Sequence, residues 1–91
     1  MSLLINNVET NLLRLPQAIK LTGLSRATFY RQVKEGLLPR QIHLGPQSVA
    51  WLSHELEAVM LARICGYDDN ALQDLVKEVM NQRRTAMEEQ L

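Results

Sequence analysis

Side chains with the chemistry of nucleic-acid recognition recur at helical spacing in residues 25–34. On a helix that begins at Arg26, one face carries small, aromatic and cationic residues: Ala27, Tyr30, Arg31 and Lys34. Arg31 is our first candidate for reading a base, because a guanidinium can donate two hydrogen bonds to O6 and N7 of guanine. An ordinary solvated helix face carries the same residue types, so this pattern alone does not decide between the two interpretations.

Polar groups around this face would suit the DNA backbone. We expect Arg26, Lys34 and Lys20 to hold phosphates, together with the Ser25 hydroxyl and the positive end of the helix. Tyr30 could give its hydroxyl to a phosphate or its ring to a thymine methyl group, or it could pack within the protein. These residues together predict a surface for double-stranded DNA.

No other group of reactive residues indicates an enzyme or a metal site. His43, His54 and Cys65 lack the spacing of zinc ligands, and the sequence has a single cysteine. We expect a histidine in a strand, an exposed histidine in a first helical turn and a buried cysteine. The sequence also lacks a glycine-rich phosphate loop and a nucleophile elbow. We therefore predict a non-enzymatic protein without a metal, a cofactor or a small-molecule ligand.

Turn residues delimit the helices that would position the basic face. Pro16 suits the first position of a helix that continues to about residue 21, and Gly23 suits the left-handed residue that ends it. Ser25 is a natural N-cap for the next helix, 26–35, whose inner face would hold Phe29 and Val33.

A β-hairpin and a third helix are predicted to follow. Two short runs of strand-forming residues flank Gly45-Pro46, which predicts a hairpin over 42–51 with Trp51 as its anchor to the helices. A hairpin directly after two helices and a tight turn would be the wing of a winged helix-turn-helix. Ser53 would then cap a helix from His54 to about Ile64. Its inner face would comprise Leu56, Val59, Met60, Arg63 and Ile64.

The last predicted helix carries one apolar stripe, formed by Leu72, Leu75, Val76, Val79 and Met80. This stripe could fold back and enlarge a small core, or it could pair with its copy in a homodimer. We favour a helix that does both. The chain thus divides into a loose N-terminus (1–11), a DNA-binding unit (12–66) and a C-terminal helical segment (67–91).

The charges separate a basic front half from an acidic back half. Residues 1–54 hold six Lys or Arg against two Glu, a net charge of +4, whereas residues 55–91 hold four against eight acidic residues, a net charge of −4. The front half can meet phosphates and the back half should be held away from them. No apolar run approaches the roughly 20 residues of a membrane span, and the N-terminus lacks the features of a secretory signal. We therefore expect a cytoplasmic protein.

From Leu15 to about Ile64, the sequence resembles the AlpA-type prophage regulators, small DNA-binding proteins of bacteria and their integrated phages. The resemblance lies in RLPQAIKLTGLSRATFYRQVKEG, LGPQSVAW and the helix opening SHELEA. It implies a mainly α fold with a small β-hairpin wing, like the winged helix-turn-helix of MerR regulators and excisionases, here with an added C-terminal helix. By this resemblance, DNA contacts would come from Ser25, Arg26, Thr28, Tyr30 and Arg31, with Arg40 and the Gly45–Ser48 turn in the wing.

Three functions are compatible with this resemblance and with the charge pattern. The first is a sequence-specific transcriptional regulator acting at prophage promoters in the bacterial nucleoid. The second is an excisionase that bends attachment-site DNA with the same surface. The third is an antirepressor-like or antitoxin-like interaction module that acts through the acidic half.

His43 and Gln47 would face DNA from the wing. The family commonly has Arg at the position of Gln47 and often a polar or basic residue at that of Leu37. Both departures reduce the positive charge near the wing, so we expect either a lower affinity for DNA or the need for a dimer.

Overall fold

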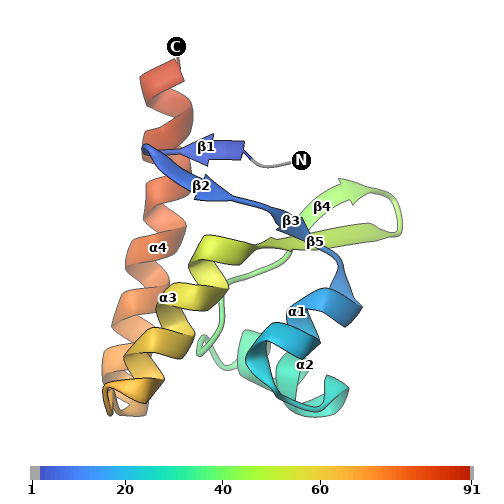
Figure 1. Ribbon diagram of the computed structural model, residues 1–91, viewed down its shortest axis with the longest axis vertical. Coiled ribbons are helices and arrows are strands. Elements are labelled where there is room, and N and C mark those ends of the chain that lie inside the picture. Colours follow the sequence, from blue (N-terminus) through green and yellow to red (C-terminus); the bar gives the residue numbers. More distant parts are fainter. Residues whose placement is uncertain (1–2, 91) are drawn as a thin grey trace.

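Four helices and two small antiparallel sheets make up the protein in the computed structural model, which describes residues 3–90 (Figure 1). The elements are, in chain order, β1 (Leu3–Ile5), β2 (Val8–Thr10), β3 (Leu12–Leu13), α1 (Leu15–Thr22), α2 (Arg26–Lys34), β4 (Ile42–Gly45), β5 (Ser48–Leu52), α3 (Ser53–Ile64) and α4 (Asp69–Gln90). The fold is therefore mixed α/β, with more β-structure than the single hairpin that the sequence predicted.

The predicted pair of helices is confirmed, together with the turn between them. Gly23 ends α1 in the left-handed conformation, with φ 72°, and donates its N–H to the Ile19 carbonyl at 2.9 Å. The Ser25 hydroxyl caps α2 by accepting from the Thr28 N–H at 3.2 Å. These two local signals fix where α1 ends and α2 begins.

The predicted hairpin is also confirmed, and it belongs to a three-stranded sheet. The strand order is β3-β5-β4, so β5 lies in the centre and pairs antiparallel with both neighbours. Gly45 pairs with Ser48, which leaves Pro46 and Gln47 as the exposed turn. Figure 1 shows the β4–β5 hairpin projecting beyond the helices, above α1 and α2.

The prediction of a loose N-terminus is wrong for the described part of residues 1–11. β1 and β2 form a tight hairpin in which Ile5 pairs with Val8. The turn residues Asn6 and Asn7 have φ values of 52° and 65°, the left-handed conformations that a two-residue hairpin turn requires and that asparagine tolerates. The Asn6 side chain donates to the Gln82 carbonyl at 3.3 Å, which fastens the hairpin to α4 (Figure 1). Residues 1 and 2 lie outside the described part of the chain.

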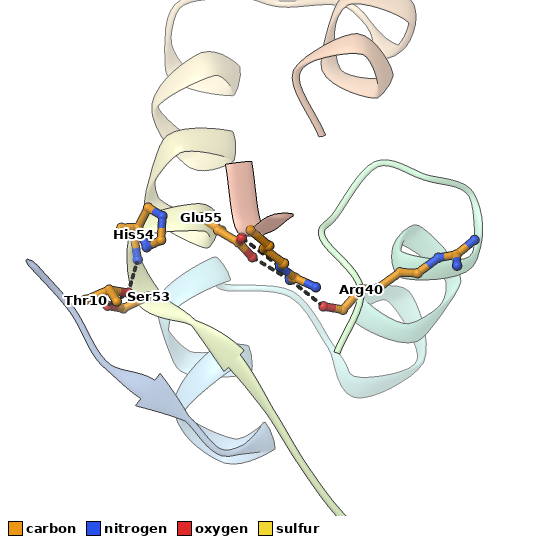
Figure 2. Close-up of polar contacts among 6 residues, drawn as sticks. Thr10, Arg40, Ser53, His54 and Glu55 are labelled. Atoms are coloured by element: carbon orange, nitrogen blue, oxygen red, sulfur yellow. Dashed lines mark hydrogen bonds and ion pairs between the residues drawn. The ribbon is translucent and has the colours of Figure 1, made fainter. Parts of the chain in front are cut away.

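The start of α3 differs from the prediction, because Ser53 is its first residue rather than its cap. Leu52 occupies the N-cap position and supplies no side-chain hydrogen bond. The acceptor comes instead from β2, where Thr10 Oγ1 receives the His54 N–H at 3.1 Å (Figure 2). The Ser53 hydroxyl accepts from the Asn11 N–H at 2.8 Å. The first turn of α3 is thus capped by a strand 43 or 44 residues earlier in the chain.

The buried face of α3 is rotated from the predicted one. Leu56 and Val59 are buried as expected, but Glu55 and Ala62 are buried with them. Ile64, predicted to face inward, is 81% exposed. The reason is that α1, α4 and β2 all pack on the side of α3 that carries Glu55, Val59 and Ala62.

The apolar stripe of α4 folds back onto the chain itself. Leu72, Val76 and Val79 are buried, and Leu75 and Met80 are partly buried against the same core. This core also contains Phe29, Leu38, Trp51 and Leu56. The predicted packing of this stripe on the core is therefore confirmed. Its central side chains are covered within one chain, and a homodimer contact from the partly buried Leu75 and Met80 stays a prediction. None of the helices in residues 3–90 combines the length and the apolar character that a bilayer span requires.

Candidate nucleic-acid interface

One aromatic contact determines which face of α2 points outward. Phe29 is fully buried, and its ring meets that of Trp51 edge to face, with centroids 4.9 Å apart and an interplanar angle of 85°. Trp51 belongs to β5, so the predicted anchor between hairpin and helices is confirmed. With Phe29 held inside, the opposite side of α2 is exposed at Arg26, Ala27, Arg31 and Lys34.

Tyr30 lies at the border between this face and the core. Its ring packs edge to face against Phe29 and Trp51, with centroids 6.2 and 6.4 Å away. The residue nevertheless stays 40% exposed. The ring of Tyr30 therefore has the packing role that the sequence left open, and a DNA contact from the exposed part of the side chain stays a prediction.

Arg31 has an acidic neighbour one helical turn away. Its Nε lies 3.6 Å from Glu35 Oε1, and the two side chains are 64% and 52% exposed. An exposed pair of this kind contributes little to stability. It therefore orients the guanidinium along the helix surface without holding it there against a competing acceptor.

The hydroxyl groups at the start of α2 are linked to one another. Ser25 Oγ accepts from the Thr28 N–H and donates to Thr28 Oγ1 at 2.9 Å. The Ser25 hydroxyl is thus engaged in capping, which leaves the Thr28 hydroxyl hydrogen available to an outside acceptor. The predicted direct phosphate role fits Thr28 better than Ser25.

The remaining predicted contacts lie outside α2 and are exposed: Lys20 on α1, Arg40 in the loop before β4, His43 on β4, and Gln47 in the hairpin turn. Arg40 and Lys34 line a common groove between the end of α2, the following loop and α4, whose Lys77 adds a third cation. Leu37, in contrast, is 7% exposed and belongs to the core, so an apolar residue suits this position. Of the two departures from the family pattern, therefore, Gln47 lowers the positive charge of the exposed surface and Leu37 does not.

The sequence interpretation missed the groups that hold these elements in place. Arg14 donates from Nε to the Val49 carbonyl at 3.0 Å, which links the start of α1 to the hairpin. Glu55, 1% exposed, is paired with Arg83 of α4. A signal for Glu55 was present, since it lies four residues before the buried Val59 and a buried carboxylate needs a partner. Nothing local identified Arg83 as that partner.

The metal interpretation has no support among the described residues. Within residues 3–90, no three His, Cys, Asp or Glu side chains are grouped so that they could hold an ion. Cys65 is exposed, not buried as predicted, and His54 is half-buried rather than exposed. His43 lies on an exposed strand position, as expected.

These features define a small mixed α/β domain whose exposed basic helix and neighbouring hairpin are compatible with DNA binding. Residues 11–64 match the family described as "Prophage CP4-57 regulatory protein (AlpA)", and the chain belongs to this family of prophage regulators. The chain is also similar to "Uncharacterized protein ORF88" of Enterobacteria phage P4, with 43% identity over 58 residues. That match covers 64% of this chain and 66% of the phage protein, slightly less than two thirds of its length. No solved structure gives a significant match.

Proposed function

We propose that this protein is a sequence-specific, double-stranded DNA-binding transcriptional regulator of prophage type. In this proposal α1 and α2 form a helix-turn-helix, and the β4–β5 hairpin is its wing. The observation that carries the proposal is that α2 has a buried and an exposed face. It buries Phe29 and leaves Arg26, Arg31 and Lys34 exposed. Membership of a family of prophage regulators supports the same function.

The exposed residues take complementary roles on DNA. Arg31, near the middle of α2, would enter the major groove and read guanine through two hydrogen bonds. Arg26 and Thr28 near the start of the helix, and Lys20 on α1, would hold phosphates. Arg40, His43 and Gln47 would contact the backbone or the minor groove from the wing. Glu35 would release Arg31 when a base offers a better acceptor.

Fluorescence anisotropy with DNA fragments from the neighbourhood of the gene tests this proposal directly. Arg31→Ala should weaken specific binding by about 1–3 kcal/mol and relax the preference at one base pair. Arg84→Ala on α4 is the matched control, because it removes an exposed arginine of the same charge from a different element. Glu35→Gln, which frees the guanidinium, should bind at least as tightly as the wild type. Unchanged affinity and specificity in Arg31→Ala would remove its assignment as the reading residue.

The salt dependence separates phosphate contacts from base contacts. Arg26→Ala should weaken binding to all sequences alike and lower the slope of log K against log salt by about one. A slope equal to that of the wild type would show that Arg26 holds no phosphate.

Two other functions use features that the same measurements can distinguish. An excisionase would use the same surface but bend attachment-site DNA, which a circular-permutation gel assay detects. An interaction module would act through the exposed acidic residues of α4, such as Asp74 and Glu78. A stable heteromeric complex in pull-down and light scattering, without DNA binding at low salt, would favour that module over the regulator.

A further inference from the structure

We propose that Arg83 of α4 is a positioning residue for the DNA-binding surface. Its guanidinium fixes the loop that contains Arg40 and leads into the β4–β5 hairpin. This inference rests on the proposed DNA-binding function and assigns α4 a part in it. The sequence predicts that α4 supports the core and contributes to a dimer. The contacts of Arg83 indicate a more specific role.

Glu55 is the buried end of this arrangement. It lies in the first turn of α3 and is 1% exposed. Arg83 donates from Nε to Oε2 at 2.9 Å and from Nη2 to Oε1 at 2.5 Å, so both carboxylate oxygens are satisfied by one guanidinium. A buried carboxylate requires such a partner, and the forked geometry is specific to arginine. The pair therefore fixes the orientation of the Arg83 guanidinium.

The same guanidinium reaches the loop before β4. Its Nη2 also donates to the Arg40 carbonyl at 2.8 Å, so one nitrogen bridges Glu55 and the loop backbone. Figure 2 shows the Arg40 side chain leaving this contact in the direction away from Glu55. The backbone of Arg40 is thus held from inside while its guanidinium is exposed to solvent. A side chain that starts from a fixed backbone loses less freedom when it binds a phosphate.

The position of Arg83 in the chain makes this contact informative. Glu55 and Arg40 lie within residues 11–64, the part that matches the prophage regulator family, and Arg83 lies outside it. The matching region therefore contains a buried carboxylate, that of Glu55, and a loop carbonyl, that of Arg40. Both accept hydrogen bonds from Arg83, which lies beyond this region. In this chain, the DNA-binding unit extends in function through α4.

The test measures stability and DNA affinity in the full chain for Arg83→Lys, Arg40→Ala and the double variant. Lysine keeps the charge beside Glu55 but cannot bond two carboxylate oxygens and the loop carbonyl through a planar fork. We expect Arg83→Lys to remain folded, to bind DNA roughly fivefold more weakly and to lower the salt slope by up to about one. Because Arg83 acts through Arg40, the double variant should bind no more weakly than Arg40→Ala alone. Arg84→Lys, one residue along α4, is the matched control and should bind like the wild type.

Several outcomes would overturn the inference. If Arg83→Lys binds DNA like the wild type while Arg40→Ala binds more weakly, Arg83 does not act through Arg40. The same conclusion follows if the two effects multiply in the double variant. Full DNA affinity of Arg40→Ala would also overturn the inference, because Arg40 would then make no contribution that Arg83 could support. If Arg83→Lys does not fold, Glu55→Gln combined with Arg83→Gln removes both charges of the pair, and the same comparison with Arg40→Ala is made in that background. Failure of the wild type itself to bind DNA would instead refute the proposed function.

Discussion

Replacement of Thr10 by valine tests whether β2 caps α3. Thr10 is 1% exposed, and its Oγ1 accepts the His54 N–H at 3.1 Å and lies 3.2 Å from the Ser53 hydroxyl (Figure 2). The N–H groups in the first turn of a helix have no partner within the helix, so they depend on such acceptors. Valine has nearly the same shape as threonine. Thr10→Val therefore removes the acceptor without opening a cavity.

The expected cost follows from the loss of that one acceptor. Loss of an N-cap oxygen costs about 0.5–2 kcal/mol, and a buried donor left without a partner costs about 1–3 kcal/mol. The two ranges describe the same interaction and are not added, so we expect Thr10→Val to lower the free energy of unfolding by about 2 kcal/mol. In a domain of this size, each kcal/mol shifts Tm by about 4–8 °C, which gives a fall of roughly 8–16 °C.

Urea unfolding followed by tryptophan fluorescence provides the measurement, because Trp51 is the single tryptophan and lies in the core. Thr10→Ser keeps the hydroxyl and loses one methyl group, which costs about 0.8 kcal/mol in burial, so it should be the milder variant. Thr85→Val makes the same chemical change at an exposed position of α4 and should stay within about 0.5 kcal/mol of the wild type. If Thr10→Val were as stable as Thr85→Val, the capping role of β2 would be refuted.

Two further variants test the turn after α1 and the packing of α4. Gly23→Ala should destabilise by about 1–2 kcal/mol in urea unfolding, because alanine resists a φ of 72°, whereas Gly23→Asn should be milder; equal stability of all three proteins would contradict the strained turn. Leu72→Ala should cost about 2–5 kcal/mol and leave the light-scattering mass unchanged, because Leu72 is fully buried within its own chain. Ile64→Ala, at an exposed position, is its control, and a Leu72→Ala protein that kept its stability but lost a dimer would instead identify Leu72 as a dimer contact.

The elements around the basic face could be predicted from the sequence because their signals are local. A left-handed glycine, a capping serine and a Gly-Pro turn each specify structure within a few residues, and all three are found where expected at Gly23, Ser25 and Gly45-Pro46. The inner position of Phe29 followed from helical spacing alone. The exposed positions of Arg26, Arg31 and Lys34 followed in turn from that one buried side chain.

The contacts that hold these elements together were not predictable in the same way. Thr10 and His54 are 44 residues apart, and Glu55 and Arg83 are 28 residues apart. Spacing along one helix cannot identify such partners, because they depend on how whole elements pack. The Asn6-Asn7 turn is different. Its left-handed residues between aliphatic runs were a local hairpin signal, and the prediction of a loose N-terminus overlooked it.

The start of α3 is the point where the segments outside the family region act on the region inside it. Ser53 and His54 are held by Thr10 at the end of the N-terminal hairpin, and Glu55 is held by Arg83 of α4; Thr10 and Arg83 both lie outside residues 11–64. β5 runs directly into this turn, so whatever fixes the turn also fixes the root of the β4–β5 hairpin. Trp51 sets the hairpin against α2 from one side, and the first turn of α3 sets it from the other. The spacing between α2 and the hairpin, the two elements of the proposed DNA-binding surface, therefore depends on both flanking segments.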